Sequence, residues 1–189
     1  MPVLSNGSHQ LMKLALRMQK GDAQAAEALY DELLPKVHGF YFARVSNRAV
    51  AEDLSQDLFL KLVSKLEGFD ASKGSFTVWF WQMARNALID YYRAKKDMVF
   101  SGFDEEVVAS FAMASAPDLD EKMLHDRLQI FLKTLASEEQ ELFELRYLAE
   151  MSYKEISAMT QKSESALRVA AFRLKEKIKK GFSNDASFL

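Results

Sequence analysis

Two aspartates on one predicted helix are the first residues whose spacing suggests chemistry. Asp53 and Asp57 are four positions apart, so a helix brings both carboxylates to the same side. Paired carboxylates can hold a metal ion, but a complete shell needs further ligands, and the histidines are scattered at His9, His38 and His125. The sequence also contains no cysteine. We therefore expect no metal, cofactor or catalytic group, and a carboxylate–metal hydrolase is an alternative that metal-dependent turnover would support.

A leucine stripe places these aspartates on the outer side of their helix. Leucines recur every four residues at positions 54, 58, 62 and 66, which is the spacing of a buried face on a helix predicted at 49–65. Five residues lie away from that stripe and form an acidic patch: Glu52, Asp53, Gln56, Asp57 and Phe59. Acidic residues beside an aromatic ring are suited to binding a protein, and an ordinary solvated helix surface is the alternative.

The next predicted helix begins near Ser75 and ends in a polar segment with possible nucleic-acid contacts. Arg85, Asn86, Asp90 and Arg93 lie near one polar face, and aromatic residues are interleaved with the cations of this segment. Cations and aromatic rings together bind the phosphates and unstacked bases of single-stranded nucleic acid. Basic residues near the end of a helix also complement its dipole, so a purely structural role is the alternative.

The last predicted helix carries the strongest concentration of positive charge. Between residues 165 and 180 there are six cations and a single acid, Glu176. A short helix starting at Ser152 and a polar turn at 160–163 precede it, which is the layout of a helix-turn-helix. In such a motif the second helix reads base edges in the major groove while its lysines contact phosphates. A solvated basic helix without DNA contacts is the alternative.

These segments must be positioned by a helical scaffold. The 189 residues are 49% hydrophobic and 28% charged, and seven glycines and three prolines favour long helices over turn-rich β structure. No segment alternates with period two over enough residues to predict a strand, so the predicted fold is all-α. The sequence shows neither a bilayer-spanning stretch nor a secretory signal, and we expect a cytoplasmic protein without membrane insertion.

The net charge of −2 hides an uneven distribution along the chain. Residues 1–98 and 122–189 each have two more cations than acids, whereas residues 99–121 contain six acids and no cation. This acidic segment, with Pro117 near its end, predicts a flexible linker between two small helical domains. We therefore divide the chain into a loose leader at 1–10, a first domain at 11–98, a linker at 99–119, a second domain at 120–182 and a tail at 183–189.

Capping and breaking residues predict several helix boundaries. The first helix is expected from Leu11, and Pro35 is expected to kink or restart the second, which begins near Ala23. The segments 137–140 and 152–155 fit the capping-box pattern. In that pattern the serine side chain caps the start of the helix, and the side chain three positions later accepts a hydrogen bond from the serine backbone N–H.

Two long segments resemble a family of bacterial transcription proteins. Residues 51–97, AEDLSQDLFLKLVSKLEGFDASKGSFTVWFWQMARNALIDYYRAKKD, resemble region 2 of sigma-70-type RNA polymerase sigma factors. Residues 134–178, TLASEEQELFELRYLAEMSYKEISAMTQKSESALRVAAFRLKEKI, resemble region 4. The short linker leaves no room for a folded region 3, which is the layout of the extracytoplasmic-function group.

The resemblance assigns a role to residues in each segment. The DLSQDLF stretch matches the part of region 2 that docks on the β′ clamp helices of RNA polymerase, which implies polymerase contacts by Asp53, Gln56, Asp57 and Phe59. The loop at 68–75 and the helix after it match the part that reads and melts the −10 promoter element, with candidate contacts Phe69, Lys73, Ser75, Trp81, Asn86, Asp90, Arg93 and Lys95. Trp79 is expected in the core, and for Trp81 a core position is the alternative. Region 4 reads the −35 element, with candidate contacts Ser165, Arg168, Val169, Phe172, Arg173 and Lys175.

The second segment departs from the family pattern at several positions. Gln161 stands where the helix-turn-helix turn usually has glycine. The recognition helix opens with residues 165–167, Ser-Ala-Leu, in place of the common Gly-Thr-Val, and Ala170 stands where an arginine is common. These changes remove one candidate phosphate or base contact, and we expect the fold to survive them.

The resemblance implies a transcription initiation subunit and no enzyme. Its partners would be core RNA polymerase, through the β′ and β subunits, promoter DNA, and an anti-sigma factor that covers the polymerase-binding and DNA-binding faces. The acidic linker would thread through a basic polymerase channel near the RNA exit. A stand-alone helix-turn-helix regulator is the alternative, and it would bind DNA tightly without polymerase while leaving the 51–97 motif unexplained.

Overall fold

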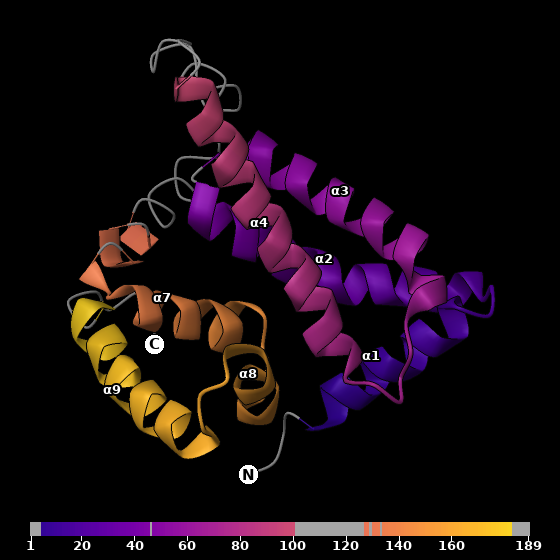
Figure 1. The fold of residues 1–189 in the computed structure, drawn as a ribbon. Helices are drawn as coiled ribbons and strands as arrows, with labels where there is room; N and C mark the ends of the chain where they lie inside the picture. Colours follow the sequence, from indigo (N-terminus) through magenta and orange to yellow (C-terminus); the bar gives the residue numbers. More distant parts are fainter. Residues whose placement is uncertain (1–4, 46, 101–126, 129, 133, 183–189) are drawn as a thin grey trace.

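The computed structural model describes residues 5–45, 47–100, 127–128, 130–132 and 134–182. Most of these residues are in helices (Figure 1). This part contains no strand, and the all-α prediction is confirmed. None of the helices described there is long and apolar enough to cross a membrane. Most of the predicted linker at 99–119 and the whole predicted tail at 183–189 lie outside the described residues.

The helices form two groups that are separate in the sequence (Figure 1). The first helix group contains α1 (Ser5–Met18), α2 (Ala23–Val45), α3 (Arg48–Lys65), the 3-10 turn η1 (Leu66–Gly68) and α4 (Phe76–Phe100). The second helix group contains α7 (Ser137–Phe143), the π-helical turn η2 (Glu144–Leu148), α8 (Tyr153–Thr160) and α9 (Glu164–Phe182), together with helical residues between 127 and 134.

The first helix group encloses an aromatic core. α2 packs on both α1 and α3, and α4 lies across α1 and α3 (Figure 1). Phe76 and Phe80 of α4 are fully buried together with Leu29 and Leu33 of α2. Asn47 caps α3, because its side-chain oxygen accepts a hydrogen bond of 3.0 Å from the backbone N–H of Val50. The predicted leucine stripe of α3 therefore faces a closed core.

Two predictions for the first helix group need correction. α1 begins at Ser5, so residues 5–10 extend the helix and are no loose leader. Helix growth is cooperative, and a periodic apolar segment can carry a polar stretch with it. α2 does not restart at Pro35 but continues from Ala23 to Val45, so the predicted restart is wrong, and the kink stays a prediction. Leu33 and Val37 on either side of the proline are buried, and this packing compensates for the missing backbone donor.

The second helix group confirms one predicted capping box and corrects the other. Glu155 accepts a hydrogen bond of 2.9 Å from the backbone N–H of Ser152, whose hydroxyl caps α8 in return. α7 starts one residue earlier than predicted, because Ala136 is its N-cap and Glu139 reaches back to the Ala136 N–H at 3.1 Å. Gln140 instead donates to the carbonyl of Leu132 at 2.6 Å and joins α7 to the preceding helical segment.

Candidate nucleic-acid interface

The acidic side of α3 is exposed along two helical turns. Asp53, Gln56 and Asp57 are all exposed, as the leucine stripe predicts. Leu60 and Val63 continue this surface, with 69% and 63% of their side chains exposed. We call these five residues the α3 acidic face. An exposed apolar patch next to carboxylates is the composition of a protein-binding surface.

Phe59 does not belong to this face and is corrected to a core residue. It is only 9% exposed, and its ring packs 4.6 Å from Tyr30 and 6.1 Å from Phe80. The buried side of α3 is therefore wider than one leucine stripe. Asp53 and Asp57 have no third ligand, because no group of three metal-binding side chains occurs among the residues that the structure describes.

Hydrogen bonds hold the loop between α3 and α4 in place. The amide of Gln19 donates to the carbonyl oxygens of Leu66 at 2.8 Å and Phe69 at 2.9 Å. Hydrogen bonds from the hydroxyl and backbone N–H of Ser72 hold the pKa of Asp70 below its usual range. The loop is therefore ordered before any ligand arrives, and Lys73 projects from it with 83% of its side chain exposed.

Two aromatic residues predicted to touch DNA are in the core. Phe69 is 7% exposed and packs 5.0 Å from Trp79. Trp81 is 1% exposed, with ring contacts to Phe40 and Phe80 at 5.4 and 5.6 Å. Neither ring can stack on a base without leaving the core, so both are corrected to structural residues. The predicted core position of Trp79 is confirmed only in part, because its side chain is half-buried.

The exposed side of α4 brings together three of the predicted residues. Asn86, Asp90 and Arg93 lie within about 60° of one another around the helix, and all are exposed. Lys95 is exposed but lies about 180° from Asn86, on the opposite side. The half-buried Gln82 extends the set, since its amide donates to the Asn86 side-chain oxygen at 3.1 Å. We call Gln82, Asn86, Asp90 and Arg93 the α4 polar stripe.

Gln82 was not among the predicted contacts, although its spacing in the sequence indicates a position on the same side of α4. Gln82 lies one helical turn before Asn86, and half-buried Trp79 lies one turn before that. Polar and aromatic residues at these intervals share one side of a helix. Extending the α4 polar stripe backwards from Asn86 would therefore have identified both residues.

The predicted −35 residues share one exposed side of α9. They occupy an arc of about 160° around the helix axis, and Val169 and Phe172 at its centre are 53% and 69% exposed. Among the described residues, neither Arg173 nor Lys175 has an ion-pair partner. We define this α9 outer face as Ser165, Arg168, Val169, Phe172, Arg173 and Lys175. Exposed apolar groups flanked by cations are suited to thymine methyl groups and phosphates in a major groove.

A stacked cluster that the sequence did not predict positions Arg168. Its guanidinium carbon lies 4.9 Å from the ring centre of Tyr153, and that of Arg146 lies 5.0 Å from the same ring. Glu164 also holds Arg168 at 3.2 Å. Because Arg146 is 22 residues from Arg168 in the sequence and belongs to another helix, no local pattern indicates this contact.

The turn between α8 and α9 places Gln161 in a conformation that favours glycine. Its φ and ψ angles are 60° and 15°, and its backbone N–H donates to the carbonyl of Ser157 at 2.9 Å. A residue with a Cβ atom in this left-handed region costs about 1–2 kcal/mol. Gln161 thus adopts the left-handed conformation that glycine adopts readily.

Replacing Gln161 with glycine is expected to stabilise the second helix group. Relief of the left-handed strain outweighs the entropy that glycine adds to the unfolded chain, and the net gain should be about 0.5–1 kcal/mol. Urea unfolding followed by circular dichroism measures this gain. Lys162→Gly is the matched control, because Lys162 has no positive φ and should lose stability. A loss of stability in Gln161→Gly would contradict the strain argument.

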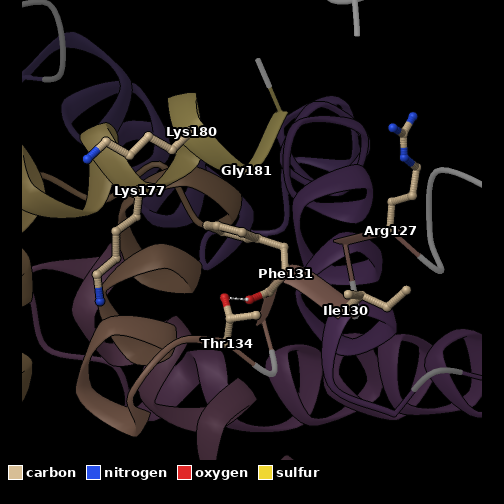
Figure 2. Close-up of a pocket in the computed structure, with 7 residues that line it drawn as sticks. All are labelled: Arg127, Ile130, Phe131, Thr134, Lys177, Lys180 and Gly181. Carbon is tan, nitrogen blue, oxygen red and sulfur yellow. Dashed lines mark hydrogen bonds between the residues drawn. The ribbon is translucent and has the colours of Figure 1, made fainter. Parts of the chain in front are cut away.

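A shallow cavity lies where the end of α9 meets the helical segment near residue 131 (Figure 2). Its volume is about 560 Å³. Phe131 and Ile130 supply apolar surface, and Lys177 and Lys180 supply positive charge. A Cβ atom at Gly181 would lie 3.0 Å from the Phe131 ring, so glycine permits the close approach. An apolar floor with a basic rim is suited to an acidic amphipathic partner.

The chain matches two protein-family descriptions. Residues 29–97 match "Sigma-70 region 2", and residues 125–178 match "Sigma-70, region 4". The first match contains the α3 acidic face and the α4 polar stripe, and the second contains the α9 outer face. Every surface that the sequence predicted thus lies within a matched region.

Known relatives are similar along most of the chain. The chain is 26% identical to the ECF RNA polymerase sigma factor BldN of Streptomyces coelicolor, over 98% of this chain and 70% of the relative. It is 31% identical to the RNA polymerase sigma factor CarQ of Myxococcus xanthus, over 86% of this chain and 92% of the relative.

Two solved structures share the fold. CnrH in complex with the cytosolic domain of CnrY has a TM-score of 0.63 at 19% identity, covering 94% of this chain and 99% of that chain. The sigma factor RpoE of Bartonella quintana, in complex with the anti-sigma factor NepR, has a TM-score of 0.61 at 20% identity, covering 84% and 97%. The similarity extends over both helix groups.

Proposed function

This chain belongs to the sigma-70 family of RNA polymerase sigma factors, in the extracytoplasmic-function group, and we propose a division of its contacts among three surfaces. It binds core RNA polymerase, directs it to promoters with −35 and −10 elements, and helps to melt the −10 region. The assignment of individual residues to these steps rests on exposure, charge and position in the matched regions.

The α3 acidic face is assigned to core polymerase. Its two carboxylates are exposed and are followed along the helix by exposed Leu60 and Val63. Exposed apolar side chains stabilise a complex by leaving water, and carboxylates give it orientation. In the family this part of region 2 docks on the β′ clamp helices. The cavity beside Phe131 is assigned to the β subunit, because it offers the second apolar surface.

The α4 polar stripe and Lys73 are assigned to the −10 element. Amide and guanidinium groups on one exposed side can bind the edges of unstacked bases and their phosphates. Phe69, Trp81 and Lys95 no longer belong to the predicted set of −10 contacts. The assigned set consists of the five predicted residues that remain and of two further residues of α4, Gln82 and half-buried Trp79. The five that remain are Lys73, Ser75, Asn86, Asp90 and Arg93. Melting then follows from binding the separated strand better than the duplex, with no covalent step by this chain.

The α9 outer face is assigned to the −35 element. Arg173 and Lys175 are available for DNA, whereas Arg168 is positioned by Tyr153 and Glu164. A recognition helix with these residues reads the major groove in helix-turn-helix proteins. The relatives' names and the match to both regions favour a polymerase subunit over a stand-alone regulator that uses the second group alone.

The cellular setting and regulation are inferred from the family. We place the chain in the cytoplasm, where polymerase and DNA are found, and assign it no enzymatic activity of its own. Bartonella quintana RpoE was solved in complex with an anti-sigma factor. We propose that an anti-sigma factor also binds this chain and covers the α3 acidic face.

The observation that carries this proposal is the presence of both region matches on two helix groups with exposed candidate surfaces. Its test is reconstitution of transcription. Purified chain and core polymerase should together initiate at a promoter with −35 and −10 elements from the source genome, and neither should do so alone. Failure to bind core polymerase and to use any such promoter would remove the proposal.

Arg173→Ala is expected to weaken promoter binding by the holoenzyme about 10- to 100-fold. One lost contact to a base or phosphate costs about 1–3 kcal/mol. Filter binding of the holoenzyme to promoter DNA measures the change, and core binding should stay within twofold. Arg17→Ala is the matched control, because Arg17 is an exposed arginine of α1 that lies outside every assigned surface and pairs with Asp22 at 2.7 Å. An equal loss of core and promoter binding would contradict a DNA role for Arg173.

A further inference from the structure

A cleft lies where α4 of the first helix group meets α8 of the second (Figure 1). Its volume is about 830 Å³, within the range of about 300–1,000 Å³ that is typical of small-molecule sites. The Ser75 hydroxyl, just before α4, donates to Glu155 of α8 at 3.2 Å and joins the two walls. Elsewhere between the groups, Arg44 of α2 donates to Glu144 of η2 at 2.9 Å. We call this space the α4–α8 cleft, and residues of both groups line it.

Positive charge exceeds negative charge in the α4–α8 cleft. Its acidic lining residues are Glu155 and Glu164, and its cationic lining residues are Lys73, Arg146, Lys154 and Arg168. Glu155 is 7% exposed, and its carboxylate accepts hydrogen bonds from Ser75 and from both the hydroxyl and the backbone N–H of Ser152. Four cations and two acids leave a surplus of two positive charges, and one of the two acids is already fully hydrogen-bonded.

Two of the cations are held close together by a single ring. The guanidinium carbons of Arg146 and Arg168 lie 5.0 and 4.9 Å from the ring centre of Tyr153, so they are at most about 10 Å apart. Arg168 pairs with Glu164 at 3.2 Å, whereas Arg146 donates to the neutral carbonyl of Met151 at 3.1 Å. Two like charges at this distance repel each other, and an anion placed between them removes the repulsion.

The cations of the α4–α8 cleft are distributed in a way that suits linked phosphate groups. Lys73 lies on the wall formed by the first helix group, whereas Lys154 and the two arginines lie on the wall formed by the second. A chain of phosphates can pair with cations of both walls at once. Arginine binds phosphate through paired N–H donors, and lysine binds it as a point charge. The small volume of the cleft excludes a DNA duplex, whose phosphates surround a core of stacked bases.

We propose that the α4–α8 cleft binds a polyphosphate anion, inorganic or carried by a nucleotide, through Lys73, Arg146, Lys154 and Arg168. Binding itself depends only on contacts within the free chain. Its consequence rests on the proposed function, in which Lys73 and Arg168 contact the −10 and −35 elements. Bound polyphosphate occupies these two side chains and competes with promoter DNA for them.

Isothermal titration calorimetry of the free, full-length chain with sodium tripolyphosphate tests the site. At about 0.15 M salt, where charges more than about 8 Å apart are screened, we expect one site per chain with a Kd of about 10–100 μM. Lys73→Ala/Lys154→Ala should weaken binding at least tenfold, and both side chains are exposed, so the fold should be retained. Arg146→Ala should weaken binding similarly, and helical circular dichroism shows whether this variant is folded.

A second double variant separates a defined site from general attraction to positive charge. Arg173→Ala/Lys175→Ala removes the same charge from exposed positions of α9 that do not line the cleft. Its affinity for tripolyphosphate should stay within twofold of the unmodified chain. Equal losses in the two double variants would overturn the proposal, as would the absence of binding at about 1 mM tripolyphosphate.

ATP and GTP, titrated in the same way, identify the source of the phosphates. A nucleotide that binds at least tenfold more tightly than tripolyphosphate identifies a nucleotide as the ligand. A smaller difference shows that the phosphate chain alone is recognised and identifies an inorganic polyphosphate.

DNA binding and transcription distinguish this inference from the proposed function. Tripolyphosphate should weaken binding of the free chain to a −35 duplex at least fivefold more than sodium sulfate does at equal ionic strength, and Lys73→Ala/Lys154→Ala should abolish this difference. If calorimetry shows the site but core polymerase and chain never initiate together, the site stands and the proposed function fails. If transcription is reconstituted but tripolyphosphate does not bind, the function stands and the inference fails.

Discussion

Reversing both charges of the α3 acidic face, in Asp53→Lys/Asp57→Lys, is expected to weaken core polymerase binding about 100-fold or more. Both carboxylates are exposed, so lysine can replace them without disturbing the core. A partner that accepts an acidic face would then meet like charges, which costs several kcal/mol, and about 2.7 kcal/mol already corresponds to 100-fold. Fluorescence anisotropy of labelled chain with core polymerase measures the affinity.

A control with the same charge change is available on α2. Glu27 and Asp31 are exposed and four residues apart, as Asp53 and Asp57 are. Glu27→Lys/Asp31→Lys should change core affinity less than threefold at physiological salt, because long-range effects of surface charge are screened beyond about 8 Å. Similar losses of core polymerase affinity in both double variants would show that the effect depends on total charge. The assignment of the α3 acidic face to core polymerase would then be wrong.

The second large effect concerns stability, in Trp81→Ala. The ring is 1% exposed and makes edge-to-face contacts with Phe40 and Phe80. Removing a buried tryptophan leaves a cavity and costs about 3–5 kcal/mol in free energy of unfolding. Urea unfolding followed by circular dichroism should therefore show a much lower midpoint for the first helix group.

Trp79→Ala provides the comparison for Trp81. Trp79 is half-buried and retains one exposed side, so its replacement should cost less than half as much. An unchanged unfolding midpoint in Trp81→Ala, combined with loss of −10 strand binding, would return Trp81 to the DNA surface. Comparison of the two variants therefore decides whether the Trp81 ring contacts DNA, as predicted, or stabilises the core, as observed.

Local sequence patterns predicted the helices better than the burial of individual aromatic residues. The spacing of leucines indicated α3, and the serine–glutamate pair at 152 and 155 indicated the start of α8. Phe59 was misassigned because it lies next to the leucine stripe, where a helix can bury a wider arc. Phe69 and Trp81 were misassigned because position within a motif does not specify which way a ring points.

Contacts between the two helix groups could not be predicted from the sequence. Arg44 and Glu144 are 100 residues apart, and each also resembles an ordinary surface charge. Sequence spacing identifies neighbours within a helix turn, whereas pairing of distant residues depends on how whole helices pack. The same limit applies to Arg146, Tyr153 and Arg168, which belong to three separate elements.

The separation of Arg44 from Glu144 in the sequence also has a consequence for synthesis of the chain. α3 packs on its sequence neighbour α2, so the first helix group can fold from local contacts as it leaves the ribosome. Roughly 40 more residues must be added before Glu144 exists, which takes about 2–8 s at typical translation rates. During that interval the nascent chain presents Lys73 and Ser75 with no second helix group beside them. A newborn chain therefore exposes these residues once, before the glutamates of the second helix group exist.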